Sequence, residues 1–302
     1  MASKVELVYT VLEVLIAVAC CLGNLLVIWA VWKCGAMRRQ PTFCFIVSLA
    51  VADFLVGAVA IPVAVLVNGW VRTSVHGCVV LCSLVIVLTQ ASVHSLLAIA
   101  LDRFLRVYIP LRYRKLVTAK RSWGVVGGCW ITACLLGSVP LLGWSLHTSQ
   151  NTTINSTHPP TCKFMDVMSM SYMVFFNFLG CILLPMLCTA ALYAYIFHLI
   201  RRRLQSWNGE SSAFYQRERS LACSLLFVLV LFALCWLPIH LINIAIYANK
   251  DVHETVLYTG ILLSHANSAV NPVVYTFKVP RIKKAYRDIC MPSWLVADRE
   301  HH

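Results

Sequence analysis

The sequence predicts an all-α membrane protein, a bundle of seven transmembrane helices followed by a short amphipathic helix. The chain is 60% hydrophobic and only 12% charged, which is about half the charged fraction of a soluble domain. Apolar stretches of at least about 20 residues, the length that crosses a bilayer, recur along almost the whole chain. Basic residues gather in alternate connections between these stretches, as they do in loops on one side of a membrane.

The predicted transmembrane segments fill most of the chain, and no internal repeat or low-complexity tract interrupts them. We therefore expect one membrane domain over residues 1–290, which includes the amphipathic helix, and a short cytosolic tail over 291–302. No separate soluble domain is expected. The predicted segments are 8–32, 43–67, 78–107, 123–144, 172–200, 221–247 and 256–277.

The placement of Lys and Arg predicts the orientation of the chain. Nearly all of the 25 basic residues lie in three alternate loops or after the last segment. The exceptions are Lys4, Arg72, Lys163 and Lys250. Basic loops stay in the cytosol, so we expect a multi-pass plasma-membrane protein with its N-terminus outside and its C-terminus inside. The net charge of +13 then reflects topology, and no nucleic-acid partner is expected.

Glycosylation sequons agree with this orientation. Asn151 and Asn155 each begin an Asn-x-Ser/Thr sequence, and both lie in the loop 145–171 that the charge rule places outside. The first segment is too long for the apolar region of a cleaved signal peptide. We expect it to act as its own signal and both asparagines to be available for glycosylation.

Polar residues recur inside three segments at helical spacing. A single Ser or Thr in a membrane helix usually bonds to its own backbone, but three polar stripes together favour an internal site. The stripes are Val85, Thr89 and Ser92; Trp236, His240 and Asn243; and Ser264, Ser268 and Asn271.

Asp53 lies in the middle of a predicted segment with no basic residue at a matching depth. A buried carboxylate must be paired, hydrated or protonated. Oxygen atoms of Asp53, Ser92, Asn267 and Asn271 suit a hard monovalent cation, so we predict an allosteric sodium site and no other cofactor. A protonated, hydrogen-bonded Asp53 is the alternative.

The order of these landmarks resembles the rhodopsin-like (class A) G-protein-coupled receptors. The resemblance covers the whole chain, and although each motif alone is weak, the ordered set is very specific. Phe104 departs from the usual tyrosine, but Asp102 and Arg103 are kept, so coupling to a G protein is expected. The motifs are Gly23-Asn24, 49–53, Asp102-Arg103-Phe104, Trp130, Pro185 with Tyr193, Cys235-Trp236-Leu237-Pro238 and Asn271-Pro272-Val273-Val274-Tyr275.

Within that family, several segments resemble the adenosine receptors, namely 43–49, 96–100, 232–240 and 261–268. The absence of lysine in 256–277 argues against retinal, and Val85 stands where amine receptors carry an aspartate. The resemblance implies adenosine as ligand and an inhibitory heterotrimeric G protein as partner. Met165, Ser264 and 213–215 favour subtype three, whereas Gln90 and Asn177 resemble subtype one; we favour subtype three.

The resemblance also implies roles for individual residues. Phe164 would stack on the purine, and the Asn243 amide would bond its edge, because an amide offers both a donor and an acceptor. Ribose hydroxyls would meet Thr89, Ser264 and His265. The implied ligand-binding residues are Phe164, Asn243, Thr89, His240, Ser264, His265, Met173, Leu237, Ile239, Ile261, Trp236 and Glu13, which would hold His265.

Further implied features lie at the two membrane surfaces. Cys78 and Cys162 are the two cysteines expected in an oxidising setting, and the resemblance implies their disulfide. Asp102, Arg103, Glu218, Tyr193 and Tyr275 would form the G-protein-coupling switch. After residue 277, Ile282, Ala285, Tyr286 and Ile289 would form the apolar face of a helix on the inner leaflet, with Cys290 placed for palmitoylation.

Alternative functions remain open at this point. One is another class A receptor for a neutral small molecule, such as a nucleotide or lipid-mediator receptor, although a nucleotide calls for basic residues in the outer halves of the helices. A membrane transporter is the other, although transporters usually show repeats or matched broken helices. An enzyme is not expected, because the adjacent Ser264 and His265 point about 100° apart on a helix.

Overall fold

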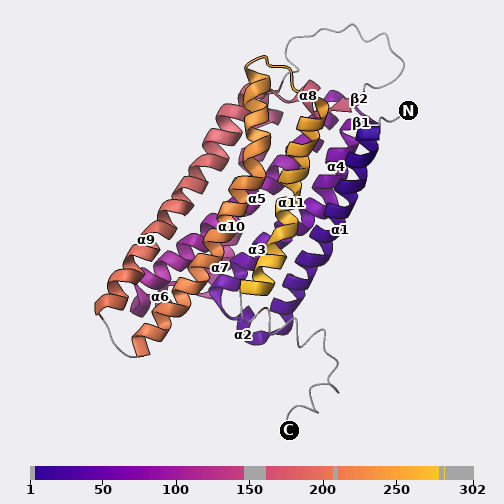
Figure 1. Cartoon of the computed structure of the whole chain (residues 1–302). Helices are drawn as coiled ribbons and strands as arrows, with labels where there is room; N and C mark the ends of the chain where they lie inside the picture. Colours follow the sequence, from indigo (N-terminus) through magenta and orange to yellow (C-terminus); the bar gives the residue numbers. More distant parts are fainter. Residues whose placement is uncertain (1–3, 146–160, 207–209, 279–281, 283–302) are drawn as a thin grey trace, which may run out of the picture.

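The computed structural model describes residues 4–145, 161–206, 210–278 and 282, which form a bundle of long helices (Figure 1). α1 begins at the end of the bundle that carries a small two-stranded sheet, and α11 ends at the opposite end. In chain order the elements are α1 (Lys4–Lys33), α2 (Gly35–Arg38), α3 (Pro41–Leu55), η1 (Val56–Ala60), α4 (Ile61–Leu66), β1 (Asn68–Arg72), α5 (Val75–Tyr108), α6 (Pro110–Leu116), α7 (Ala119–Gly137), η2 (Val139–Leu142), β2 (Thr161–Lys163), α8 (Phe164–Val167), η4 (Tyr172–Leu183), α9 (Leu184–Ser206), α10 (Glu210–Tyr247) and α11 (Glu254–Lys278).

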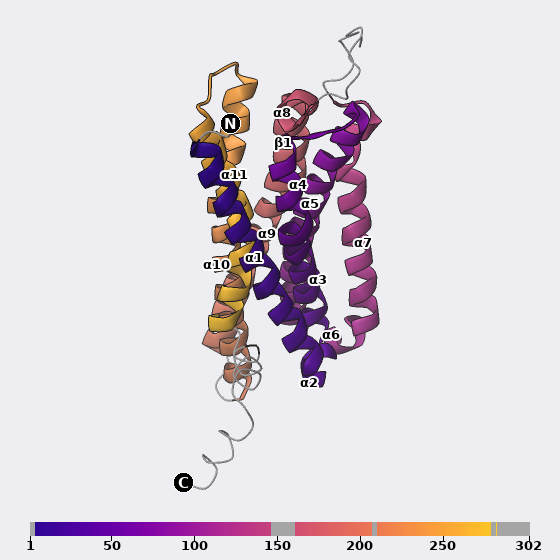
Figure 2. The ribbon, with the colours of Figure 1, turned by 90° about the vertical axis from the view of Figure 1, so that its right-hand side faces the viewer.

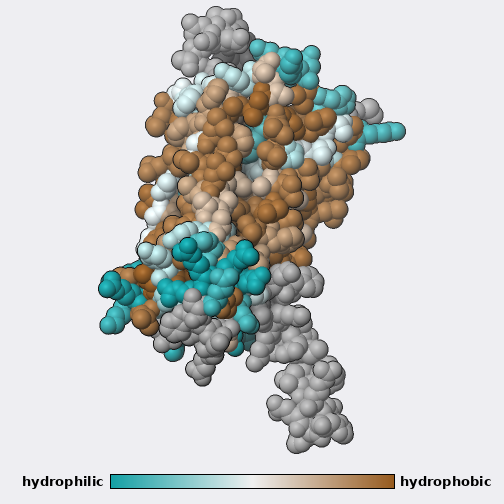
Figure 3. Space-filling model, turned by 60° about the vertical axis from the view of Figure 1, so that its left-hand side comes forward, coloured by the Kyte–Doolittle hydropathy of each residue, from teal (hydrophilic) through white to brown (hydrophobic). Residues whose placement is uncertain are grey.

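Five of the helical units in the described chain are long and apolar enough to cross a membrane on their own. α7 and α11 lie among them in the bundle, α7 on the side away from α10 and α11 (Figure 2). A broad apolar surface covers the visible face, and hydrophilic residues gather toward its ends (Figure 3). α11 is less apolar because it carries the predicted polar stripe. The five units are 4–33, 41–66, 75–108, 172–205 and 213–247.

Two membrane helices contain π-helical turns that the sequence analysis did not predict. η1 ends two residues before Pro62, and η4 ends two residues before Pro185. A proline ring clashes with the carbonyl four residues earlier, and a wider π turn relieves that clash. Pro238 and Pro272 lie inside helices that stay α-helical.

α5 is the central helix, since it packs against α3, α7, α9 and α10. Its contact with α7 is especially close, because a Cβ built on Gly137 would lie 2.8 Å from the Val87 Cα. On the other side of the bundle, α1 packs against α11. At Gly137, the absence of a side chain allows the backbones of α7 and α5 to approach this closely.

The sheet end of the bundle is held by the predicted disulfide between Cys78 and Cys162. It joins the first turns of α5 to β2, with the two Cα atoms 5.5 Å apart. β2 pairs antiparallel with β1, and the Phe164 N–H that follows it donates to the Val67 carbonyl at 3.2 Å. We call this end the disulfide end, and the opposite end, where Arg103 lies, the basic end.

Several predictions fall outside the described residues and stay predictions. They concern the two sequons, the amphipathic helix apart from Ile282, and the boundary between the membrane domain and the tail. Tyr275 lies within α11, but its side chain is not among those described. The residues concerned are Asn151, Asn155, Cys290 and 283–302.

Candidate ligand-binding and switch sites

His240 is the most unusual buried side chain in the half of the bundle toward the disulfide end. It is 2% exposed and stacks between the rings of Phe178 and Trp236, with centroid distances of 4.3 and 5.8 Å. Among the described residues, neither ring nitrogen of His240 has a hydrogen-bond partner, and nor does the Trp236 indole nitrogen. Buried polar atoms are nearly always paired, so both ring nitrogens of His240 are free to bond to a further polar group.

Three helices bring further polar groups to this half of the bundle. Asn243 lies on the same face of α10 as His240, about one turn further along, and is also buried. The buried hydroxyls of Thr89 and Ser264 donate to their own helices, to the Val85 carbonyl at 3.1 Å and the Ile261 carbonyl at 2.7 Å. Each hydroxyl oxygen keeps lone pairs that can accept from another molecule.

His265 is held from the first helix, as the sequence analysis expected. Its Nδ1 lies 2.9 Å from both carboxylate oxygens of Glu13, and both side chains are buried. The contact joins α1 to α11 and fixes the orientation of the imidazole. A buried carboxylate without such a partner would be strongly unfavourable.

The expected apolar wall is only partly assembled. Met173 is buried, and Phe164, Ile239 and Ile261 are half-buried. Leu237 does not belong with them, because it is 47% exposed, on the same side of α10 as the exposed Leu234 and Leu241. It follows Trp236 by one residue and is therefore rotated about 100° away from the polar face.

The sequence did not predict that Gln90 and Asn177 contact each other in this region. The Gln90 amide donates to the Asn177 Oδ1 at 2.8 Å, which links α5 to η4, and the Gln90 Oε1 has no partner among the described residues. The signal was available, since both are amides in apolar segments. Phe178 gave no signal, because it is one of many aromatic residues in these helices.

Asp53 lies at the centre of a second polar cluster, which joins α3, α5 and α11. Ser92 and Ser268 donate to its Oδ1 at 3.1 and 2.9 Å, and Asn271 donates to its Oδ2 at 2.7 Å. The structure therefore brings together three of the four predicted sodium ligands and adds Ser268. Asn267 is buried, but it is not among the described donors to Asp53, because it precedes Ser268 and points to another side of the helix.

The donor set of this cluster fits a hard cation. A carboxylate, two hydroxyl oxygens and an amide converge where no described Lys or Arg pairs with Asp53. Oxygen ligands of this kind suit ions that bind through charge and small size. Asp53, Ser92, Ser268 and Asn271 would hold sodium, which would supply the positive charge that the carboxylate lacks.

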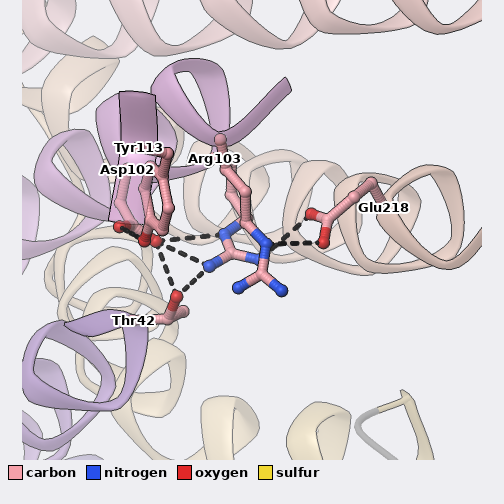
Figure 4. Close-up of polar contacts among 6 residues, drawn as sticks. Thr42, Asp102, Arg103, Tyr113 and Glu218 are labelled. Carbon is pink, nitrogen blue, oxygen red and sulfur yellow. Dashed lines mark hydrogen bonds and ion pairs between the residues drawn. The ribbon is translucent and has the colours of Figure 1, made fainter. Parts of the chain in front are cut away.

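At the basic end, a third network surrounds Arg103 (Figure 4). Asp102 accepts from Arg103, Thr42 and Tyr113, each at 2.6 Å. Arg103 also donates to the Thr42 hydroxyl and forms the predicted ion pair with Glu218 on α10, at 3.2 Å. These contacts bind the inner parts of α3, α5, α6 and α10 together.

The protonation of Tyr113 fits its role as a donor. Burial raises the pKa of its phenol, and the neighbouring Asp102 carboxylate raises it further. The hydroxyl therefore keeps its proton and can donate to Asp102. Tyr193, another predicted switch residue, is buried in the core on the same half of the bundle.

Comparison with known proteins decides the family. Residues 23–275 match the sequence model of the "7 transmembrane receptor (rhodopsin family)". The chain belongs to this family. The predicted fold class is thereby confirmed, and so is the prediction that the chain is a receptor and not an enzyme.

Among the curated relatives that this rhodopsin-family receptor matches are three called "Adenosine receptor A3". The one from Ovis aries is 45% identical over 300 residues, which cover 96% of this chain and 94% of the relative. The one from Bos taurus is 44% identical over 300 residues, with the same coverage. The one from Canis lupus familiaris is 42% identical over 281 residues, 92% of this chain and 89% of the relative. The predicted resemblance to the adenosine receptors, with subtype three favoured, is confirmed.

Proposed function

We propose that this receptor binds extracellular adenosine near the disulfide end and signals through an inhibitory heterotrimeric G protein, which lowers adenylate cyclase activity. The observation that carries the proposal is His240, a buried imidazole with both nitrogens unpaired among the described residues. Polar groups from three helices lie on the same half of the bundle. The names of the relatives support the choice of adenosine.

The chemistry of the residues suits a neutral nucleoside. Phe164 offers an aromatic face for the purine, and the Asn243 amide offers a donor and an acceptor for its polar edge. The ribose hydroxyls can donate to the oxygens of Thr89 and Ser264 and can bond to His265, which Glu13 holds in place. No Lys or Arg belongs to this set, so nothing there would neutralise the phosphates of a nucleotide.

The orientation follows from the charge distribution. The disulfide end faces the extracellular space, where disulfides persist, and the basic end faces the cytosol of the plasma membrane. The proposed ligand therefore reaches its site from outside. Arg103 and Glu218 then lie where a cytosolic G protein can meet them.

Signalling requires two conformations that the agonist binds with different affinity. In the resting conformation, Glu218 ties α10 to Arg103, and sodium would neutralise Asp53. Agonist contacts on α5, α10 and α11 would tighten around Trp236, and α10 would swing about Pro238. Arg103 would then leave Glu218 and meet the G protein, with Tyr193 and Tyr275 assisting.

The decisive test is the binding of a radiolabelled adenosine analogue to membranes that contain the receptor. We expect Asn243→Ala to weaken binding by about 10- to 100-fold, because it removes a donor and an acceptor worth about 1–3 kcal/mol. Leu241→Ala is the matched control, since Leu241 lies two residues away on the exposed side of α10. Unchanged binding in Asn243→Ala would remove the proposed central contact.

The class of G protein is tested separately in cells. Adenosine should lower stimulated cyclic AMP in cells that express the receptor. That response should vanish when the inhibitory α subunits are deleted. A rise in cyclic AMP would assign the receptor to the stimulatory class instead, without affecting the binding proposal.

A further inference from the structure

The carboxylate of Glu218 is held by two arginines. Arg103 Nη1 lies 3.2 Å from one oxygen, and Arg106 Nε lies 2.9 Å from the other. The Glu218 side chain is 4% exposed, whereas that of Arg106 is 31% exposed. Arg106 therefore reaches from the surface to a buried carboxylate, and its ion pair is the shorter of the two.

Arg106 also contacts the short helix α6. Its guanidinium carbon lies 5.8 Å from the centroid of the Tyr113 ring, within the range of a cation–π contact. Tyr113 donates to Asp102, and Asp102 pairs with Arg103. The contacts close into a ring that runs from Asp102 through Arg103, Glu218, Arg106 and Tyr113 back to Asp102.

The formal charges in this ring balance. It contains two carboxylates and two guanidinium groups, so its net charge is zero. Without Arg106, two carboxylates would share one guanidinium, and a buried site would carry an excess negative charge. Movement of Glu218 into water relieves this charge, and a shift of the inner end of α10 away from α5 brings it there.

We propose that Arg106 is a positioning residue that holds Glu218 in the resting conformation and joins α6 to α10 through Tyr113. Loss of Arg106 frees the inner end of α10 even though Arg103 and Asp102 are intact. The ring opens as a unit, because both guanidinium groups share one carboxylate. Its consequence for signalling rests on the proposed coupling to a G protein, but the restraint on α10 does not.

The first test measures α10 directly, in purified receptor in lipid nanodiscs without ligand or G protein. Hydrogen–deuterium exchange is followed in the peptide that spans residues 213–222. We expect Arg106→Gln to speed exchange there by about two- to fivefold, the effect of losing a partly exposed ion pair. Arg106→Lys, which keeps the charge, should lie between Arg106→Gln and the parent chain.

Arg112→Gln is the matched control, because Arg112 is an exposed arginine on α6. It should leave exchange in 213–222 unchanged. Equal exchange in the parent, Arg106→Gln and Arg112→Gln would overturn the proposal. If Arg106→Gln does not fold, then equal exchange in Arg106→Lys and the parent overturns it in the same way.

The second test asks whether Arg106 acts through Glu218. Ligand-independent nucleotide exchange on the G protein is measured for Arg106→Gln, Glu218→Gln and the double variant. Each single change should raise basal exchange, and Arg106→Gln should add little once Glu218 is neutral. If the effects of Arg106→Gln and Glu218→Gln on basal nucleotide exchange add in the double variant, the proposal that Arg106 acts through Glu218 is overturned. If none of the variants, Glu218→Gln included, promotes nucleotide exchange, the proposed coupling to a G protein fails. The hydrogen–deuterium measurement then still decides whether Arg106 restrains α10.

Discussion

At the scale of single residues, the receptor pairs most of its buried polar groups within the protein, and the unpaired atoms include those of two stacked rings on α10. Asp53, Glu13 and Asp102 each bond to side chains on other helices. His240 and the Trp236 indole do not, among the described residues. The proposed ligand would offer partners to these buried atoms, which otherwise carry the cost of an unmade hydrogen bond.

The Asp53 cluster leads to a prediction about salt. If sodium binds there and favours the resting conformation, raising sodium chloride should weaken binding of an adenosine analogue to the parent receptor. Asp53→Asn keeps the shape of the side chain but removes the charge, so binding of the adenosine analogue should no longer respond to sodium chloride. The measurement is competition binding across a sodium series, with potassium chloride at equal ionic strength as control. A response to potassium as large as that to sodium would point to general screening.

Sequence spacing placed most of this cluster together, and the two predicted residues that the structure leaves apart, Asn267 and Leu237, share one cause. The stripe 264, 268 and 271 correctly put Ser268 on the face of Asn271, yet Asn267 was chosen as an ion ligand because amides are conspicuous. The rotation of the helix determines which side chain faces Asp53, since a shift of one residue rotates a side chain by about 100°. The same rotation turns Leu237, one residue after Trp236, away from the polar face of α10.

At the scale of helices, most ends of the hydrophobic segments were predicted to within a few residues, because the bilayer fixes their length. The exceptions are α10, which begins at Glu210 and not at 221, and α7, which ends at Gly137 and not at 144. The π turns before Pro62 and Pro185 were not predicted. A proline can kink a helix, shift its bonding or leave it α-helical, and the choice depends on neighbouring helices. Pro238 and Pro272 show the α-helical outcome.

Close approach between helices can be tested with a pair of glycines on α7. Gly137→Ala would place a Cβ 2.6 Å from a Val87 methyl carbon and 2.8 Å from backbone atoms that cannot yield. We expect a loss of about 1–3 kcal/mol in the free energy of unfolding and a Tm lower by several degrees. The measurement is thermal unfolding of the purified receptor followed by tryptophan fluorescence.

Gly128→Ala is the control for this change. Gly128 is exposed on the same helix, and nothing lies within 4 Å of the Cβ it would gain. Alanine is the better helix former by about 1 kcal/mol, so Tm should stay constant or rise. A fall in Tm as large as that of Gly137→Ala would mean that α7 tolerates no alanine for reasons other than its contact with α5.

At the scale of the whole molecule, the polar networks divide the bundle into three levels. The His240 region lies toward the disulfide end, the Asp53 cluster lies deeper, and the Arg103 ring lies at the basic end. α10 and α11 each contribute to two of these levels, so a movement of either helix disturbs more than one. The first two levels were predicted because each polar residue in an apolar segment is conspicuous, and the third was predicted from the resemblance to the receptor family. The ring through Arg106 and Tyr113 could not be predicted, since a charge at the end of a helix gives no sign of its partner on another helix.

The orientation of the molecule in the membrane is the remaining whole-molecule prediction. Basic loops resist transfer across the membrane, and all but four of the 25 basic residues lie on one side of the predicted topology. An epitope fused to Met1 should therefore bind antibody on intact cells, and one fused to His302 only after permeabilisation. Asn151→Gln with Asn155→Gln should abolish the mass lost on treatment with an N-glycosidase. Antibody binding to the C-terminal epitope on intact cells would invert the topology, and would place Arg103 and Glu218 where no G protein could reach them.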